Sequence, residues 1–247
     1  MSDSLIPGFV TVRTSSTRLP NKCLLPFGAG NVLEHVIRRA LKYGIDPIVC
    51  TSVDRSDDAI EAIAKSEGVK FFRGSLTNKL KRWSDCAERF GLDSFHTVDA
   101  DDPFFDGTEM KESMALHSKR KLDMIYPSKV SSSGAGSVGY SLSTEVVQRA
   151  VTALDEKADT EMMWFYVEKL PNLKTAVLPD NPRTPHNMRL TLDYVEDYCL
   201  LETVRKVVGN FAMRKDIDQI FIDNPALYQV NWFRNEEWKA AQVAKKI

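Results

Sequence analysis

A regular alternation of short apolar segments with amphipathic segments over the first hundred residues most constrains how this chain can fold. The apolar segments show little polar alternation, which is typical of strands buried on both faces. Each of the first three apolar segments is followed by a segment in which apolar residues recur at helical spacing. Strands that alternate with helices predict a parallel sheet covered by helices on both faces. The expected strands span residues 9–12, 47–51, 69–72 and 94–98, and the expected helices span residues 31–43, 57–66 and 78–90.

The first expected strand leads into a basic loop within residues 10–22. The loop carries the three cations Arg13, Arg18 and Lys22, and four hydroxyl side chains at positions 14–17. Arginine offers a planar fork of donors and lysine a compact charge, so this cluster can receive a polyphosphate. The alternative is a solvated basic loop, because loops are often polar.

Other polar residues also directly follow expected strands. Arg73 comes after the third strand, and the acidic segment Asp99-Ala-Asp101-Asp102-Pro103 comes after the fourth. Parallel strands place such residues at one edge of the sheet, where ligands bind. Adjacent carboxylates repel one another, which favours a bound cation, and magnesium is commonly held by one or two carboxylates plus phosphates. The alternative is an acidic turn that Pro103 ends.

The second half of the chain is less regular. An acidic residue, Asp193, follows an expected strand and precedes a long amphipathic segment, so it could cap a helix with Glu196 at the third position or join Asp101 at a metal. The segment 160–170 is rich in methionine and aromatic residues, which favours a buried or subunit-facing helix over a ligand surface. Expected strands span residues 123–126, 138–142, 174–178 and 189–192; expected helices span residues 107–118, 144–154, 160–170, 195–208, part of 211–223 and 235–247; residues 131–136 are an expected flexible loop.

Composition limits the classes of partner. Lysine and arginine number 33 against 34 acidic residues, a net charge of −1, so bulk charge predicts neither a nucleic-acid nor a membrane partner. The four cysteines are scattered, which supports neither a zinc ribbon nor a disulfide scaffold. The N-terminus lacks the pattern of a signal peptide, and no run approaches the ~20 apolar residues of a membrane span. We expect a cytoplasmic protein with one domain over residues 1–247.

Four blocks together resemble the cytidylyltransferase family. The segment from Arg13 to Lys22 resembles the family's Arg-x-x-Ser-Thr-Arg-Leu-Pro-x-Lys opening, and 72–75 resembles its Phe-Arg-Gly-Ser element. Residues 101–103 are similar to Gly-Asp-x-Pro without its glycine, and 189–197 resembles Arg-Leu-Thr-Val-Asp-x-x-Glu-Asp. The spore coat polysaccharide type is the most similar, and the 3-deoxy-manno-octulosonate and acylneuraminate enzymes are related to it.

This resemblance implies a three-layer α/β fold of the nucleotide-diphospho-sugar transferase type, Rossmann-like and GT-A in style, with a mostly parallel central sheet. It implies transfer of CMP from CTP to an acidic sugar of the 2-keto-3-deoxy type, with release of pyrophosphate, for a surface polysaccharide. It also implies a homodimer, in which residues 1–130 bind the nucleotide and residues 131–247 bind the acceptor and form the dimer.

The resemblance also assigns roles to individual residues. Arg13, Arg18 and Lys22 would hold the triphosphate, Ser16 would add a donor, Arg73 would lie near the nucleotide, and Asp101 and Asp193 would ligate Mg²⁺. Arg13, Lys22 and Asp101 would be the catalytic residues. In-line attack on the α-phosphorus needs positioning and charge neutralisation rather than a His or Cys nucleophile.

The chain departs from the family pattern at Ser15 and Asn21, where the family has glycines that allow close approach of the backbone to phosphate. The segment 131–164, where the acceptor should bind, departs most. A phosphonate or a sugar phosphate is therefore an alternative acceptor. Two further alternatives are a GT-A glycosyltransferase, with Asp99 and Asp101 as its metal motif, and a non-catalytic nucleotide-binding relative.

Overall fold

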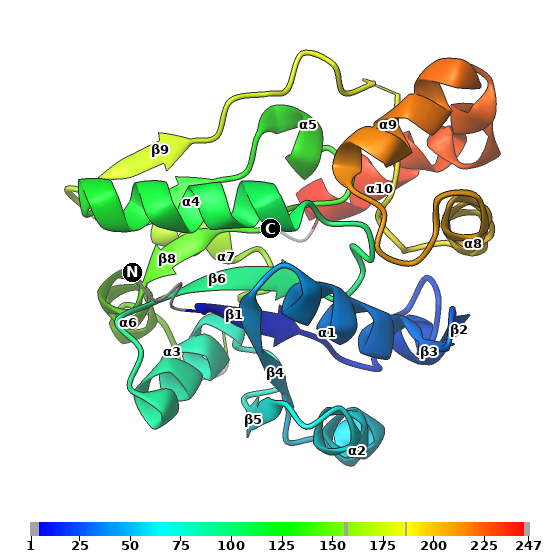
Figure 1. Ribbon diagram of the computed structural model, residues 1–247. Helices are drawn as coiled ribbons and strands as arrows, with labels where there is room; N and C mark the ends of the chain where they lie inside the picture. Colours follow the sequence, from blue (N-terminus) through cyan, green and yellow to red (C-terminus); the bar gives the residue numbers. More distant parts are fainter. Residues whose placement is uncertain (1–4, 156–157, 186, 245–247) are drawn as a thin grey trace.

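The computed structural model describes residues 5–155, 158–185 and 187–244. The alternation of strands and helices in the first part of the chain is confirmed, and Figure 1 shows these elements stacked around the central strands. In order, this part contains β1 (Ile6–Thr11), β2 (Pro26–Phe27), β3 (Gly30–Asn31), α1 (Val32–Lys42), β4 (Ile45–Ser52), α2 (Asp58–Ser66), β5 (Lys70–Gly74), α3 (Lys79–Phe90) and β6 (Ser94–Asp99).

The second part of the chain adds three strands to the same sheet. It contains α4 (Gly107–Arg120), β7 (Met124–Tyr126), α5 (Lys129–Ser132), β8 (Ser141–Ser143), α6 (Thr144–Thr152), α7 (Met163–Val167), β9 (Thr175–Val177), α8 (Val195–Val208), α9 (Arg214–Asp223) and α10 (Asn235–Ala244). The strand order of the seven-stranded sheet is β5-β4-β1-β6-β8-β7-β9. All neighbouring pairs are parallel except those of β8, which runs antiparallel to β6 and β7. The expected mostly parallel sheet is therefore confirmed.

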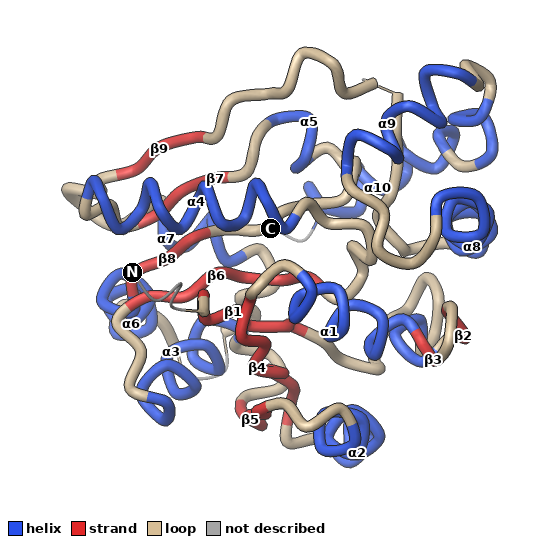
Figure 2. Tube along the Cα trace, in the orientation of Figure 1, coloured by secondary structure: helices blue, strands red, loops and turns tan. Residues whose placement is uncertain are grey.

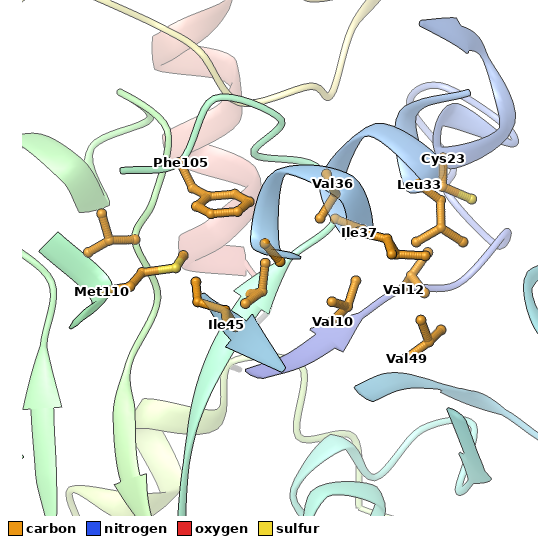
Figure 3. Packing of buried hydrophobic residues seen from close by; sticks show 14 of the residues in the cluster. Val10, Val12, Cys23, Leu33, Val36, Ile37, Ile45, Val49, Phe105 and Met110 are labelled. Carbon is orange, nitrogen blue, oxygen red and sulfur yellow. The ribbon is translucent and has the colours of Figure 1, made fainter. Parts of the chain in front are cut away.

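Helices cover both faces of this sheet, as the strand pattern predicts. Val10 and Val49 face the layer of α1, α2 and α4, and Figure 3 shows them beneath Val36 and Ile37 of α1. The neighbouring residue Phe9 faces the opposite layer of α3, α6 and α7. Successive strand residues thus enter two different cores, which explains why these strands carry few polar residues.

Several expectations for the second part are wrong. The segment 189–192 forms no strand, and Figure 2 draws it as loop. Its amides donate to two separate loops, from Leu190 to the Gly134 carbonyl (2.7 Å) and from Leu192 to the Asp101 carbonyl (2.7 Å), so no ladder forms. The aromatic helix spans only Met163–Val167, β8 begins at Ser141 rather than at residue 138, and α5 includes part of the expected flexible loop. Residues 245–247 of the expected final helix lie outside the described residues.

Helix ends follow the local sequence in most places. Asn31 and Glu34 form the expected capping box of α1, and Gly91 ends α3 in the left-handed conformation. Asp193, however, does not cap α8. The cap position is Tyr194, and the Asp197 carboxylate accepts from the amides of both Asp193 and Tyr194 (2.9 Å each). In the part of the chain that the structure describes, each helix is too short or too polar to cross a bilayer.

Candidate functional site

A cavity of about 820 Å³ opens where β1 and β6 end. Six of the seven residues predicted for the site line it, and they come from three separate stretches of the chain. The basic end of the cavity comprises Arg13, Arg18 and Lys22 from the loop after β1, Asp101 from the loop after β6, and Asp193 from the segment before α8; Ser16 lies on the same loop as the three cations. The strand ends bring the basic loop and Asp101 together as the sequence predicts, whereas Asp193 arrives on a loop, because 189–192 forms no strand.

Asp57 fixes the start of the basic loop. Its carboxylate accepts hydrogen bonds from the Thr14 amide (2.9 Å), the Thr14 hydroxyl (2.8 Å) and the Ser52 hydroxyl. Burial alone would raise the pKa of Asp57, but the bonds from Ser52 and Thr14 outweigh it and hold the pKa below its ordinary value. The ends of β1 and β4 are thereby tied to each other beneath the loop.

The two departures from the family glycines fit the structure. Asn21 adopts the left-handed conformation, with φ at 54°, which asparagine tolerates better than most residues. Ser15 is not among the described residues with positive φ, so no glycine is required there. The basic loop can therefore form with the side chains this chain has.

Lys22 is the centre of the basic end. Its ammonium lies 2.6 Å from Asp101 Oδ2, 2.8 Å from Asp193 Oδ1 and 2.9 Å from the Leu192 carbonyl, and its side chain is 14% exposed. Burial opposes the charged form, but Asp101 and Asp193 outweigh burial and raise the pKa of Lys22 above its ordinary value. The lysine is therefore cationic at any physiological pH.

Asp193 is held by cations on two sides. Arg18 Nη2 lies 2.8 Å from its second oxygen, and the carboxylate is 3% exposed. Burial would raise the pKa of Asp193, but Lys22 and Arg18 lower it below its ordinary value. The segment behind it is rigid because Arg189 donates two hydrogen bonds to Asp197, at 2.9 and 3.0 Å.

The acidic segment after β6 divides into different environments. Asp102 accepts a bond from the Thr191 hydroxyl (2.6 Å) and is buried, and burial raises its pKa well above the ordinary value. Burial also raises the pKa of Asp99 to about 6. Asp101, which is 31% exposed, is the member that contacts Lys22. The predicted cluster is thus one buried carboxylate, Asp102, beside the partly exposed Asp99 and Asp101.

The carboxylates of Asp101 and Asp193 suit a small divalent cation. Within the described residues, no group of three or more His, Cys, Asp or Glu side chains is placed to hold a metal by itself. The two carboxylates nevertheless converge on a single cationic atom, the ammonium of Lys22. Magnesium typically takes one or two carboxylates and completes its shell with phosphate oxygens and water, so this pair fits it.

Arg73 is not brought to the cavity. Its guanidinium contacts Asp58 (2.7 Å) and Glu61 (2.9 Å) and donates to the Ser52 and Asp54 carbonyls. These contacts hold the loop between β4 and α2, which also carries Asp57. Arg73 therefore supports the basic loop indirectly, through the loop that carries Asp57, and does not line the cavity.

Sequence reasoning missed several other residues that line the cavity. Arg13 pairs with Glu161 at 2.6 Å, and Lys79 contacts the other oxygen of Glu161 at 3.2 Å. The second half of the chain also contributes a group of uncharged lining residues, which we call the neutral wall: Ser131, Ser132, Ser137, Tyr140, Met162 and Trp164. Met163 and Val167 of α7 are buried, so the expected packing role of the aromatic segment holds for one side of the helix only. No local motif marks these positions.

Comparison with known proteins gives one family and a consistent set of relatives. The family described as cytidylyltransferase matches residues 8–223. An uncharacterised protein of Methanocaldococcus jannaschii is 27% identical over 233 residues, which cover 92% of this chain and 94% of the relative. The spore coat polysaccharide biosynthesis protein SpsF of Bacillus subtilis is 27% identical over 226 residues, which cover 88% of this chain and 91% of SpsF.

Solved structures share the fold. A cytidylyltransferase from Leptospira borgpetersenii superposes with a TM-score of 0.80 at 24% identity, over 91% of this chain and 96% of that one. A CMP:2-keto-3-deoxy-manno-octonic acid synthetase complexed with CTP gives 0.57 at 17% identity, over 83% and 98%. A Mycobacterium tuberculosis protein in complex with manganese gives 0.56 at 16% identity, over 81% and 98%. The expected α/β fold is confirmed.

Proposed function

This chain belongs to the cytidylyltransferase family and is a nucleotidyltransferase, and from that premise we propose that it transfers CMP from CTP to an acidic sugar of the 2-keto-3-deoxy type. The observation that carries this proposal is the convergence of Arg13, Arg18 and Lys22 with Asp101 and Asp193 on one cavity. A cluster of cations beside two carboxylates suits a triphosphate with its metal. The names of two similar proteins, SpsF and the synthetase complexed with CTP, support a role in making an activated sugar acid.

In the proposed reaction, a hydroxyl oxygen of the acceptor forms a bond to the α-phosphorus of CTP, and the hydroxyl proton passes to solvent. The bond from that phosphorus to the β-phosphate oxygen breaks, and pyrophosphate leaves with the electron pair. Arg13, Arg18 and Lys22 bind the phosphates and stabilise the charge that develops on the leaving pyrophosphate, and Ser16 adds a donor. No covalent intermediate with the protein is needed.

Asp101 and Asp193 would hold magnesium. Bound there, the ion would neutralise negative charge on the nucleotide and orient the phosphate that is transferred. The manganese complex of the Mycobacterium tuberculosis protein supports the use of a divalent cation. Lys22, which both carboxylates hold, lies close enough to exchange these contacts for contacts with phosphate oxygens.

We further propose that residues 1–130 bind the nucleotide, that residues 131–247 bind the acceptor and form a homodimer, and that both halves belong to one domain. The cavity supports this division, because its basic loop comes from the first half and its neutral wall from the second. Light scattering of the purified protein measures the oligomeric state, and a monomeric mass contradicts the dimer.

The test of the function is a screen of the four nucleoside triphosphates with magnesium against 2-keto-3-deoxy sugar acids, phosphonates, sugar phosphates and neutral sugars. Release of pyrophosphate from CTP with a sugar acid is the expected result. Release with a phosphonate or sugar phosphate instead would change the acceptor, and release with another nucleotide would change the donor. No release with any pair contradicts catalysis.

The metal assignment is tested with a matched pair of carboxylates. Asp101 and Asp46 are both 31% exposed, and each contacts a lysine, at 2.6 and 2.7 Å, but only Asp101 lines the cavity. We expect Asp101→Asn to raise the magnesium concentration for half-maximal activity by roughly tenfold, because one anionic ligand is lost. Asp46→Asn should leave that concentration unchanged. Equal behaviour of the two variants would remove Asp101 from the metal site.

A further inference from the structure

The last described helix, α10, forms part of the cavity although it lies beyond the end of the family match at residue 223. Trp238, Lys239 and Gln242 of this helix line the cavity together with the neutral wall. Figure 1 shows α10 (red) passing below α9 toward the middle of the molecule, near the ends of the central strands. This part of the cavity is therefore built by a segment that the matched family region does not include.

The positive charge of Lys239 on α10 is less neutralised than the other positive charges that line the cavity. Five cationic side chains line the cavity in the described part of the chain: Arg13, Arg18, Lys22, Lys79 and Lys239. The first four contact Glu161, Asp101 or Asp193, which are at most 31% exposed. Lys239 contacts Glu236, which is 84% exposed, at 3.2 Å within one helical turn. Exposed pairs of this kind contribute little, so Lys239 can exchange its partner for a ligand.

Polar atoms beneath α10 also lack partners. Asn235 and Trp238 from α10, and Arg189 and Asn231 beneath it, each keep at least one buried nitrogen or oxygen without a hydrogen bond. Gly134 of the cavity wall lies beside two of these groups, because a Cβ built on it would be 3.4 Å from Arg189 Nη1 and 3.6 Å from Asn235 Oδ1. Native proteins leave few such atoms unpaired, so α10 packs here without completing the polar contacts around it.

On the basis of the function proposed above, we propose that α10 is the acceptor-recognition element, in which Lys239 binds the anionic group of the acceptor. Trp238 offers a flat apolar ring beside this charge, which suits the less polar face of a sugar. The Ser137 hydroxyl of the neutral wall accepts from the Gly139 amide (3.1 Å) and can donate its own proton to a sugar hydroxyl. The proposed function assigns the nucleotide to Arg13, Arg18 and Lys22, and on that premise Lys239 is left for the acceptor.

A matched lysine elsewhere gives the control. Lys206 of α8 is 70% exposed and lies 4.0 Å from Glu202, one helical turn away, as Lys239 is 49% exposed and lies one turn from Glu236. Lys206 does not line the cavity. Replacing either lysine with glutamine removes one exposed charge and one weak pair, so a difference between the variants reports on the cavity.

The experiment measures pyrophosphate release with CTP and the sugar acid that the wild-type protein uses, for Lys239→Gln, Lys239→Glu, Lys239→Arg and Lys206→Gln. We expect Lys239→Gln to raise the KM for the acceptor about three- to tenfold, and Lys239→Glu to raise it further, with the KM for CTP and kcat little changed. Lys239→Arg should keep the affinity, because the charge remains. Lys206→Gln should match the wild type.

Other results overturn the assignment in distinguishable ways. If the wild type uses a sugar acid and Lys239→Gln behaves as Lys206→Gln does, α10 does not read the anion, although the proposed function stands. If Lys239→Gln raises the KM for CTP instead, the lysine serves the nucleotide. If the wild type releases pyrophosphate only with neutral acceptors, or with none, both the function and the role of Lys239 are wrong. Calorimetric titration of each variant with CTP confirms that the basic end is intact.

Discussion

The basic end and the neutral wall of the cavity differ in how their side chains are held. The basic loop and Asp101 directly follow β1 and β6, and ion pairs at 2.6–2.8 Å connect Lys22, Asp101 and Asp193. The neutral wall rests on the short helices α5 and α7 and on loops, and hydroxyl and aromatic groups replace charges there. Strand ends set positions rigidly, whereas loops tolerate change, so this fold can keep the basic end constant while the neutral wall varies.

We expect the largest effect on turnover from a substitution at Lys22, in the basic end. Lys22→Ala should lower kcat roughly 10²- to 10³-fold, because a preorganised charge on the triphosphate is lost. Lys70→Ala is the control, because Lys70 contacts Asp46 at 2.7 Å outside the cavity, much as Lys22 contacts Asp101. Pyrophosphate release measures both. Wild-type turnover in Lys22→Ala would show that the basic end does not serve the reacting phosphates.

The second prediction concerns the backbone that connects the two regions. Gly139 has φ at 76°, and a Cβ built there would lie 2.0 Å from the Thr97 carbonyl oxygen of β6. Gly139→Ala should lower the free energy of unfolding by about 3 kcal/mol, because left-handed strain and overpacking add. Gly44→Ala, with φ at 74° and open space around the site, should cost only about 1 kcal/mol. Urea denaturation compares them, and equal losses would mean that the contact with Thr97 is unimportant.

The smallest expected effect is a pH dependence at the junction of β6 and β8. His96 is fully buried, and its ring contacts the Ser141 hydroxyl (2.9 Å) and the Val138 carbonyl. Burial lowers the pKa of His96 to about 4, although the bond to Val138 opposes this shift. The unfolded chain takes up the proton near pH 6.5, before the folded chain does, so stability falls as the pH falls from 6.5 toward 4.

Between pH 7 and pH 5 this group should account for a loss of about 2 kcal/mol of unfolding free energy. Urea denaturation of the wild type and of His96→Gln at both pH values isolates it, since other titrating groups, including the nearby His117, remain in both proteins. The variant should lose less stability on acidification. Identical pH dependence would show that His96 keeps an ordinary pKa.

Sequence reasoning succeeds where a local pattern determines the structure. Short stretches contain the apolar runs of β1 and β4, the capping box at Asn31 and the cations after β1. The parallel order of the strands then places the cations at one edge of the sheet. The prediction of a strand over 189–192 is wrong. Its residues are typical of strands, but no strand lies beside it to form hydrogen bonds. Glu161 could not be foreseen as the partner of Arg13, because 148 positions separate them and no motif marks either one as a pair.

The place of β8 in the sheet has a consequence for synthesis of the chain. β7 is made before β8, yet β8 lies between β7 and β6 in the sheet. Until the residues up to Ser143 have emerged, β6 carries an unpaired edge, which can pair with another nascent chain. At about 5–20 residues per second, the stretch from the end of β6 at Asp99 to Ser143 takes roughly 2 to 9 s to translate. Slow codons in that stretch should therefore lengthen the period in which the growing chain is open to aggregation.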